Sequence, residues 1–313
     1  MPDQPSRARV LAAFAAIYII WGSTYLAIRI AIDTVPPFVM AGTRFVIAGT
    51  ALYAWARARG AAAPTRPQLL GAIIIGMLLL TSGNGAVVWA EQRVPTGLTA
   101  LLVAMVPVWT VLVEWLRPGG TRPAARVIMG LLVGFGGVIL LVAPGQIAGG
   151  AHVDPIGALA LMGGSLSWSI GSVYSKRAAL PPSPQVATAV EMLAGGTGLL
   201  LAGVLSGEFG QVHPSAISGH SLLAVLYLIV FGSLVAFSAF VWLLRVSTPA
   251  RVSTYAYVNP AVAVLLGWAF AGETLTGRTL LAAGVIVAAV VLITSATAAG
   301  PRPSRLPATA RSR

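Results

Sequence analysis

The sequence lacks cysteine altogether and is poor in histidine and in charged side chains. Without cysteine the chain can form no disulfide and offers no thiolate to a metal. The histidines, His152, His213 and His220, fall in predicted loops without the spacing of a metal site, so we expect no metal and no cofactor. Only 9% of the residues are charged, whereas soluble domains average about 25%. The composition therefore excludes a water-soluble globule.

Apolar side chains dominate instead, at 57% of 313 residues and a mean hydropathy of +0.86. A bilayer span needs about 20 largely apolar residues. Runs of this kind cover 10–31, 37–56, 68–90, 96–116, 124–142, 156–175, 186–205, 221–244, 250–271 and 278–298. The first run continues too far for a signal peptide and lacks a small-residue cleavage site, so we expect it to be retained. The sequence predicts an all-α integral membrane protein of ten transmembrane helices.

Basic residues outnumber acidic ones by 20 to 8. In a soluble protein this excess would indicate nucleic-acid binding, but here the basic residues lie in short loops, where they orient spans in a bilayer. If the N-terminus is cytoplasmic, only Arg93 and Arg278 lie in outer loops, and Arg29 and Arg44 fall within helices. All other basic residues lie inside. The pattern predicts a multi-pass protein with both termini cytoplasmic, surrounded by lipid and without a nucleic-acid partner.

The second half of the chain repeats features of the first at offsets of 147 and 153 residues. The pairs are Trp21 with Trp168, Arg29 with Lys176, Pro37 with Pro184, Gly49 with Gly196, Trp89 with Trp242, and Pro107 with Pro260. Because each half holds an odd number of spans, the second half would lie inverted, as in many secondary transporters. We predict a five-helix repeat over 1–147, an inverted repeat over 148–298 and a basic cytoplasmic tail over 299–313.

Polar and aromatic side chains in the middle of apolar helices are the candidate binding residues. Unpartnered polar groups are costly at that depth, and an aromatic-walled central cavity with a few hydrogen-bonding groups would explain them. The alternative is that they pack the helices together. The candidate substrate-binding residues are Trp21, Tyr25, Asn84, Trp168, Ser172, Tyr255, Tyr257 and Asn259.

Two prolines and one glutamate are candidates for the transport cycle. Pro107 and Pro260 remove backbone hydrogen bonds inside predicted helices, either as gating hinges or as static kinks. Glu191, at the repeat position of Arg44, is the candidate for proton coupling, because carboxylates inside a membrane mark proton pathways. Alternatively, Glu191 bonds to a neighbouring helix, or to Lys176 and Arg177 at the cytoplasmic edge.

Small residues four apart favour close helix packing. Gly130 and Gly134 form one such pair, and Gly284 and Ala288 form another. Their helices can pack on each other within one chain or in a homodimer.

An ordered set of short motifs spans about residues 10–298. The motifs are Trp21-Gly22-Ser23, Pro36-Pro37 with Ala41-Gly42-x-Arg44-Phe45, Trp89-Ala90-Glu91, the helix from Pro95 to Pro107, and Asn259-Pro260 with Gly272-Glu273. The set resembles the EamA-type branch of the drug/metabolite transporter superfamily, most closely the YedA-like permeases. The resemblance implies an inverted five-plus-five repeat and export of metabolites, amino acids or toxic compounds across the bacterial cytoplasmic (inner) membrane. Gly119-Gly120 replaces the Gly-Glu pair in the first half, so any role of that glutamate is confined to one half.

These features predict a secondary transporter that exports small amphipathic metabolites or amino-acid-like compounds by alternating access. Aromatic lining favours apolar or cationic cargo, and the scarcity of buried arginine and lysine in the predicted cavity argues against phosphorylated sugars. The alternative is a lipid flippase or a channel-like protein. An enzyme is disfavoured because the spans carry no histidine, cysteine or paired carboxylates. We therefore expect no catalytic residues. No ATP-binding G-x-x-x-x-G-K-[ST] motif occurs, which argues against primary active transport by this chain alone.

Overall fold

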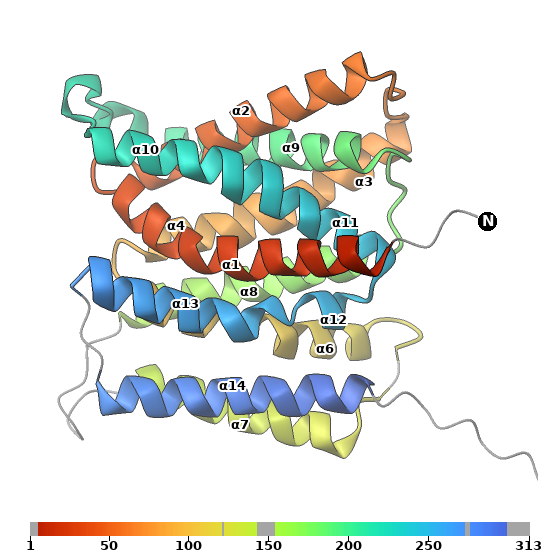
Figure 1. Cartoon of the computed structure of the whole chain (residues 1–313), viewed down its shortest axis with the longest axis vertical. Helices are drawn as coiled ribbons and strands as arrows, with labels where there is room; N and C mark the ends of the chain where they lie inside the picture. The colour runs from red at the N-terminus through yellow and green to blue at the C-terminus, as the bar shows by residue number, and fades with distance from the viewer. Residues whose placement is uncertain (1–5, 121, 143–153, 273–275, 299–313) are drawn as a thin grey trace, which may run out of the picture.

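The computed structural model describes residues 6–120, 122–142, 154–272 and 276–298, and within these ranges it contains helices and no strands. The helices pack side by side into a bundle (Figure 1). Their bounds are α1 Arg7–Ala31, α2 Pro37–Ala58, α3 Arg66–Gly76, η1 Met77–Asn84, α4 Gly85–Ala90, α5 Thr96–Val103, α6 Val106–Leu116, α7 Ala125–Val142, α8 Pro155–Tyr174, α9 Pro184–Leu205, η3 Glu208–Gln211, η4 Pro214–Ala216, α10 Gly219–Tyr227, η5 Leu228–Phe237, α11 Ser238–Val246, α12 Pro249–Val252, α13 Tyr255–Phe270 and α14 Gly277–Ala298.

Seven helical stretches in the described residues are long and apolar enough to cross a membrane. They are Arg7–Ala31, Pro37–Ala58, Arg66–Ala90, Thr96–Leu116, Pro155–Tyr174, Pro184–Leu205 and Gly219–Val246. Large apolar side chains such as Leu159 and Leu205 point outward, 74% and 89% exposed, as expected for a surface in contact with lipid tails. The described residues are thus all-helical, as predicted, and are consistent with a membrane protein, whereas the predicted spans over 124–142, 250–271 and 278–298 stay predictions.

Two predicted spans are broken into two helices each. The span over 96–116 divides at Ala104 and Met105, because Pro107 has no N–H to donate to the last residue of α5. The span over 250–271 divides at Ser253 and Thr254, whose hydroxyls donate to carbonyls three residues earlier and so compete with the helical backbone bonds. Pro260 lies inside α13 and the helix continues through it. The second break is therefore not at the proline, and the two breaks are not at repeat-related positions.

Two other spans contain π-helical segments, which the apolar pattern does not reveal. η1 connects α3 to α4, and η5 connects α10 to α11, without interrupting the helix. Segments with this wider backbone winding are rare and are found most often at functional sites. The end of η1 at Asn84 and the end of η5 at Phe237 are 153 residues apart, the second repeat offset.

Helices α2 and α9 pack together at the level of the backbone. A Cβ built on Gly49 would lie 3.0 Å from the carbonyl oxygen of Ala189, and one on Gly196 would lie 2.9 Å from that of Gly42. Side chains larger than hydrogen at either glycine would push the two helices apart. The pair lies on the side of the bundle away from α7 and α14 (Figure 1).

Helices α7 and α14 pair with each other at one edge of the bundle (Figure 1). Gly134 allows the approach, since a Cβ there would lie 3.3 Å from that of Ala289. Gly284 faces open space instead. Gly134 of α7 is thus used within one chain, and the homodimer stays a prediction.

Candidate functional site

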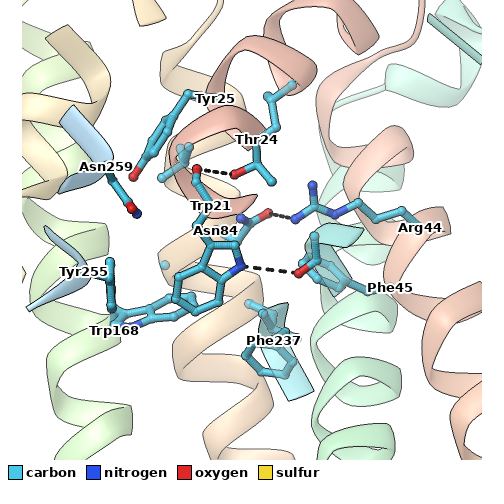
Figure 2. Close-up of a pocket in the computed structure, with 15 residues that line it drawn as sticks. Trp21, Thr24, Tyr25, Arg44, Phe45, Asn84, Trp168, Phe237, Tyr255 and Asn259 are labelled. Carbon is cyan, nitrogen blue, oxygen red and sulfur yellow. Dashed lines mark hydrogen bonds between the residues drawn. The ribbon is translucent and has the colours of Figure 1, made fainter. Parts of the chain in front are cut away.

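A cavity in the middle of the bundle gathers most of the predicted binding residues (Figure 2). We call it the Arg44 cavity. It has about 590 Å³ of space free of protein atoms, of which about 70 Å³ is open to the centres of water molecules. Its lining residues are Trp21, Thr24, Tyr25, Ile28, Arg44, Phe45, Leu80, Gly83, Asn84, Val87, Trp168, Gly232, Phe237, Tyr255 and Asn259.

Six of the eight predicted binding residues line this cavity: Trp21, Tyr25, Asn84, Trp168, Tyr255 and Asn259. Ser172 does not, because its hydroxyl donates to the carbonyl of Trp168 in the same helix at 2.8 Å. The side chain of Tyr257 lies outside the described residues. That the lining residues bind a substrate stays a prediction.

Aromatic rings close one side of the Arg44 cavity. Trp21 lies edge-on to Trp168, with ring centroids 5.6 Å apart, and edge-on to Tyr255 at 5.0 Å. Phe240 packs against both tryptophans at 5.1 and 5.3 Å. We call Trp21, Trp168, Phe240 and Tyr255 the aromatic cluster. The indole N–H of Trp21 donates to the carbonyl of Gly232 in η5 at 3.3 Å, which fixes the ring against the π-helical segment.

Arg44 supplies a positive charge to the lining, contrary to the predicted scarcity of basic groups in the cavity. It is only 4% exposed and donates from one terminal nitrogen to the side-chain oxygen of Asn84 at 3.2 Å (Figure 2). Its guanidinium carbon lies 4.2 Å from the centre of the Phe45 ring. The Nε and the other terminal nitrogen have no hydrogen-bond partner among the residues that the structure describes. The sequence predicts Arg44 within a helix, at the repeat position of Glu191 and in the motif Ala41-Gly42-x-Arg44, but not in the cavity lining.

Hydrogen bonds hold the start of α2, the helix that carries Arg44, and the side chain of Asn259. Glu208, from the connection after α9, accepts hydrogen bonds from the backbone N–H groups of Phe38 and Val39 at the start of α2, the position where a helix favours negative charge. Burial raises the pKa of the Glu208 carboxyl above its ordinary value. Asn259 can donate its amide nitrogen to the carbonyls of Tyr18 and Tyr255, which leaves its side-chain oxygen as an acceptor.

A second cavity lies beside Glu191, which is 1% exposed. We call it the Glu191 cavity. It has about 830 Å³ of atom-free space, about 360 Å³ of it open to the centres of water molecules. Its lining residues are Ile75, Leu79, Ser175, Lys176, Ala178, Leu180, Glu191, Val241, Leu244 and Arg245. Both carboxyl oxygens of Glu191 lack a hydrogen-bond partner within the described ranges.

Two basic side chains share the Glu191 cavity. Arg245 donates to the carbonyls of Pro181 and Pro182, both at 2.9 Å, and so clasps the connection between α8 and α9. Lys176 follows α8, and partial burial lowers the pKa of its ammonium group. Lys176 lines the same cavity as Glu191, but within the described residues neither carboxyl oxygen of Glu191 accepts a hydrogen bond from it. Arg245 was not anticipated, because it is distant in sequence.

The two cavities follow one another along three elements. In α8 and its end, Trp168 lines the first cavity and Ser175 the second; in η5 and α11, Phe237 lines the first and Val241 the second. In η1, Leu80 and Leu79 divide in the same way. Three residues of the aromatic cluster line the Arg44 cavity, and the fourth, Phe240, directly precedes Val241 of the Glu191 cavity in α11.

Comparison with known proteins identifies the family of this bundle. The family described as EamA-like transporter family matches residues 8–143 and again residues 155–295. The chain belongs to the EamA-like transporter family. The transporter is 47% identical over 283 residues to YedA, an inner membrane transporter of Escherichia coli (strain K12), covering 90% of this chain and 89% of that one. It is 27% identical to the transporter YvbV of Bacillus subtilis (strain 168), covering 93% of each chain. A solved crystal structure superposes with a TM-score of 0.66 at 25% identity, over 93% of this chain and 99% of the other.

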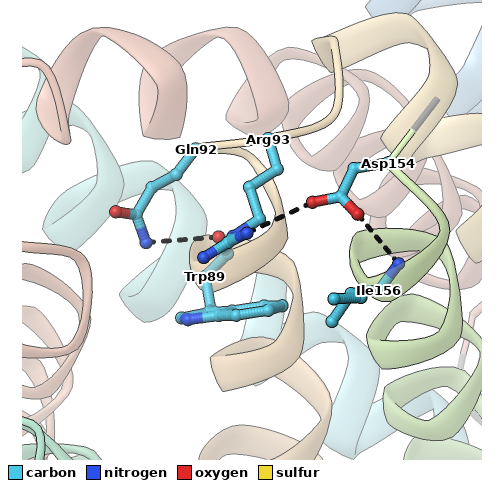
Figure 3. A network of polar contacts seen from close by, with 5 residues as sticks. All are labelled: Trp89, Gln92, Arg93, Asp154 and Ile156. Carbon is cyan, nitrogen blue, oxygen red and sulfur yellow. Dashed lines mark hydrogen bonds and ion pairs between the residues drawn. The ribbon is translucent and has the colours of Figure 1, made fainter. Parts of the chain in front are cut away.

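At one end of the EamA-like bundle, a polar network ties α4 to the start of α8 (Figure 3). Arg93 pairs with Asp154 at 3.3 Å, and its guanidinium carbon lies 4.7 Å from the centre of the Trp89 ring. Asp154 also accepts the backbone N–H of Ile156, and this bond, with the smaller effect of Arg93, lowers the pKa of the carboxyl. Trp242, the repeat counterpart of Trp89, carries Arg9 over its ring. Both tryptophans therefore lie near helix ends, as expected for interfacial residues.

No group of three or more histidine, cysteine, aspartate or glutamate side chains that could hold a metal occurs in the part of the transporter that the structure describes. The chemistry on offer in the two cavities is therefore hydrogen bonding, charge and aromatic contact. An arrangement of this kind can bind a small molecule and hold it in a fixed orientation.

Proposed function

We propose that the chain is a secondary transporter that exports small amphipathic metabolites or amino-acid-like compounds across the bacterial inner membrane by alternating access. The observation that carries this proposal is the succession of two cavities along the same helices, and we propose the aromatic cluster as the closed section between them. A carrier needs a path from each side and a closed section between them. The relative YedA is named as an inner membrane transporter, which supports the same membrane here.

An inverted five-plus-five repeat is part of the proposal. The family matches the chain twice, and the contacts between α2 and α9 are reciprocal at the 147-residue offset. Gly49 meets Ala189, and their counterparts Gly196 and Gly42 meet in turn. Trp21 also contacts its own counterpart Trp168. Contacts of this kind are expected where two related halves face each other across a local two-fold axis.

The proposed orientation places both termini in the cytoplasm. The start of α1 and the end of α14 lie at the same end of the bundle (right in Figure 1), which is the end of the Glu191 cavity. The excess of basic residues in the connections at that end supports a cytoplasmic assignment. The Arg44 cavity then lies nearer the outer face.

Glu191 remains the proposed proton-coupling residue, and Pro107 and Pro260 remain proposed hinges. A buried carboxyl group beside a water-accessible cavity can exchange protons with the cytoplasm, and Arg245 and Lys176 line the same cavity. Pro107 adjoins the break between α5 and α6, where a change of backbone angles costs few hydrogen bonds. Pro260 lies in the continuous α13 next to the cavity-lining Asn259.

Comparison of metabolites inside and outside cells tests the export proposal. Untargeted mass spectrometry of medium and cytosol would compare cells without the protein, cells that overproduce it, and cells that overproduce Trp21→Ala. Trp268→Ala is the matched control, because Trp268 is 58% exposed on the lipid-facing surface. We expect one class of compounds to accumulate outside with the wild type and Trp268→Ala only. Identical profiles for wild type and Trp21→Ala would contradict export through this cavity.

Counterflow in proteoliposomes separates a carrier from a channel or a flippase. A carrier exchanges labelled for unlabelled substrate across the membrane, whereas a pore lets the gradient dissipate without exchange. The packed rings of the aromatic cluster, as the proposed closed section, support exchange by a carrier. Substrate leakage without accelerated exchange would favour the channel.

A further inference from the structure

We propose that the Arg44 cavity selects a monocarboxylate with an apolar body of about the size of an aromatic ring. The carboxylate would bind the Arg44 guanidinium, and the body would lie against Trp21, Trp168 and Tyr255. This inference deepens the proposed transport function and rests on it for its place in the cycle.

The first argument is the unmet hydrogen-bonding capacity of Arg44. A guanidinium carries five N–H groups in a flat fork that matches a carboxylate. In the described residues Arg44 has one side-chain partner, Asn84, while two nitrogens buried at the cavity have none. A buried charge without sufficient partners is costly, so an anionic ligand at this place would satisfy groups that the chain itself leaves unsatisfied.

The second argument is the sign of the charge. The lining contains one arginine and neither aspartate nor glutamate. Glu91, buried at the end of α4, is the acidic group whose field reaches Arg44, but it is not part of the lining. An organic cation would therefore meet a positive charge without a carboxylate to bind it. A phosphate group carries nearly two negative charges, more than the single positive charge of Arg44 can balance.

The third argument is the shape of the rest of the lining. Trp21, Trp168 and Tyr255 present ring faces and edges, and Ile28, Leu80 and Val87 are aliphatic. Aromatic surfaces stack on flat apolar bodies, and the space open to water is small. The ligand would have its charge at one end and an apolar group at the other.

Binding of four probes that differ in one group tests the inference. The probes are 3-phenylpropionate, its amide, the corresponding amine 3-phenylpropylamine, and phenylalanine, which adds an ammonium group to the acid. Quenching of tryptophan fluorescence in the detergent-solubilised full chain reports binding, because two tryptophans line the cavity. We expect the acid to bind at least about ten-fold more tightly than the amide, since hydrogen bonds between charged partners are about twice as strong as neutral ones. We expect the same margin over the amine and phenylalanine, because their ammonium group would meet the positive charge of Arg44 in a lining without aspartate or glutamate.

Two variants assign the preference to Arg44. Arg44→Gln removes the charge, whereas Asn84→Asp keeps it and places a carboxylate on it from within the chain. Each is expected to lower the affinity for the acid about ten-fold, to the level of the amide. Asn84→Asp carries the test if Arg44→Gln does not fold. Arg66→Gln, an exposed arginine at the start of α3, is the matched control and should bind as the wild type does.

Three results would overturn the inference: tighter or equal binding of the amine or phenylalanine, preference for the acid that survives Asn84→Asp, or no binding of any probe. Its failure is distinct from failure of the transport proposal. Export that depends on Trp21 but concerns compounds without a carboxylate refutes the inference alone. Selective binding of the acid without counterflow in proteoliposomes refutes transport and leaves the binding site standing.

Discussion

Arg44 and Glu191 each lie seven residues after the proline that begins their helix, 147 residues apart, and each is almost fully buried beside a cavity. Around Arg44 the walls are aromatic and about 70 Å³ is open to the centres of water molecules; around Glu191 the walls are aliphatic and basic, and about 360 Å³ is open. Positions 147 residues apart thus carry a basic and an acidic side chain in contrasting surroundings. In the proposed function the narrow cavity selects the ligand, and the wide one serves exchange of protons with water.

Gly76→Ala should have the largest effect, because it disturbs the packing of α3 against α9 at Glu191. A Cβ on Gly76 would overlap the backbone of Glu191, so α3 and α9 would have to separate. We expect a loss of about 3 kcal/mol in the free energy of unfolding, read as a lower thermal midpoint in detergent. Gly163→Ala, where a Cβ meets nothing within 4 Å, is the control. Equal midpoints for both variants would contradict close packing at Glu191.

Trp21→Ala should open the closed section that we propose between the Arg44 cavity and the Glu191 cavity. The variant loses contacts with Trp168 and Phe240 and the bond to Gly232. We expect counterflow of the exported compound to fall about ten-fold or more, because aromatic stacking and the closed section are lost together. Trp268→Ala should exchange at the wild-type rate. Full counterflow in Trp21→Ala would show that the aromatic cluster does not separate the cavities.

Glu191→Gln tests whether the wide cavity handles protons. The amide keeps the size of the side chain but has no proton to exchange, while Arg245 and Lys176 remain in the cavity. We expect transport to become independent of pH from mildly acidic to mildly basic conditions, with substrate affinity within about two-fold of the wild type. Transport and fluorescence titrations over the same pH series measure both. An unchanged pH profile would make Glu191 a structural residue.

Glu208→Gln should have the smallest effect. Glu208 binds the start of α2, the helix that carries Arg44. Burial raises the pKa of this carboxyl above 4.5, so the folded chain holds the proton more tightly than the unfolded chain. Its contribution to stability is therefore greatest below the unfolded pKa and falls as pH rises through the raised one. Between about pH 4 and about pH 7, the thermal midpoint of the wild type should fall by about 2 °C more than that of the variant. A larger fall in Glu208→Gln would reverse the sign of the argument.

Hydropathy predicts where helices run, and most of the expected bounds agree with the structure to within a few residues. It does not predict the π-helical segments, because their winding depends on close packing such as that of Gly83 against Trp168. Thr81-Ser82-Gly83-Asn84 and Gly232-Ser233 were the local signals: small and polar residues in the middle of an apolar run. These segments carry or hold residues on both sides of the Arg44 cavity.

The candidate cavity could be predicted in part because buried tryptophan, tyrosine and asparagine are conspicuous in an apolar sequence. Arg44 was recognised as buried, but its place in the lining depends on its distance from Asn84, which belongs to another helix. Ser172 shares the helix of Trp168, yet its hydroxyl is bound within that helix. Helical spacing predicts on which face of its helix a residue lies. Whether its side chain lines the cavity depends on partners in other helices, which the spacing does not give.

The glycine contacts between α2 and α9 have a mechanical consequence. Because backbone meets backbone there, no change of rotamer can lengthen or shorten the contact, and one helix cannot slide along the other without a clash. Arg44 lies between Gly42 and Gly49, and Glu191 lies between Ala189 and Gly196, so both residues are in the segment that the two contacts hold. Under the proposed alternating access, α2 and α9 would therefore move as one unit, and Arg44 and Glu191 would keep their distance from each other.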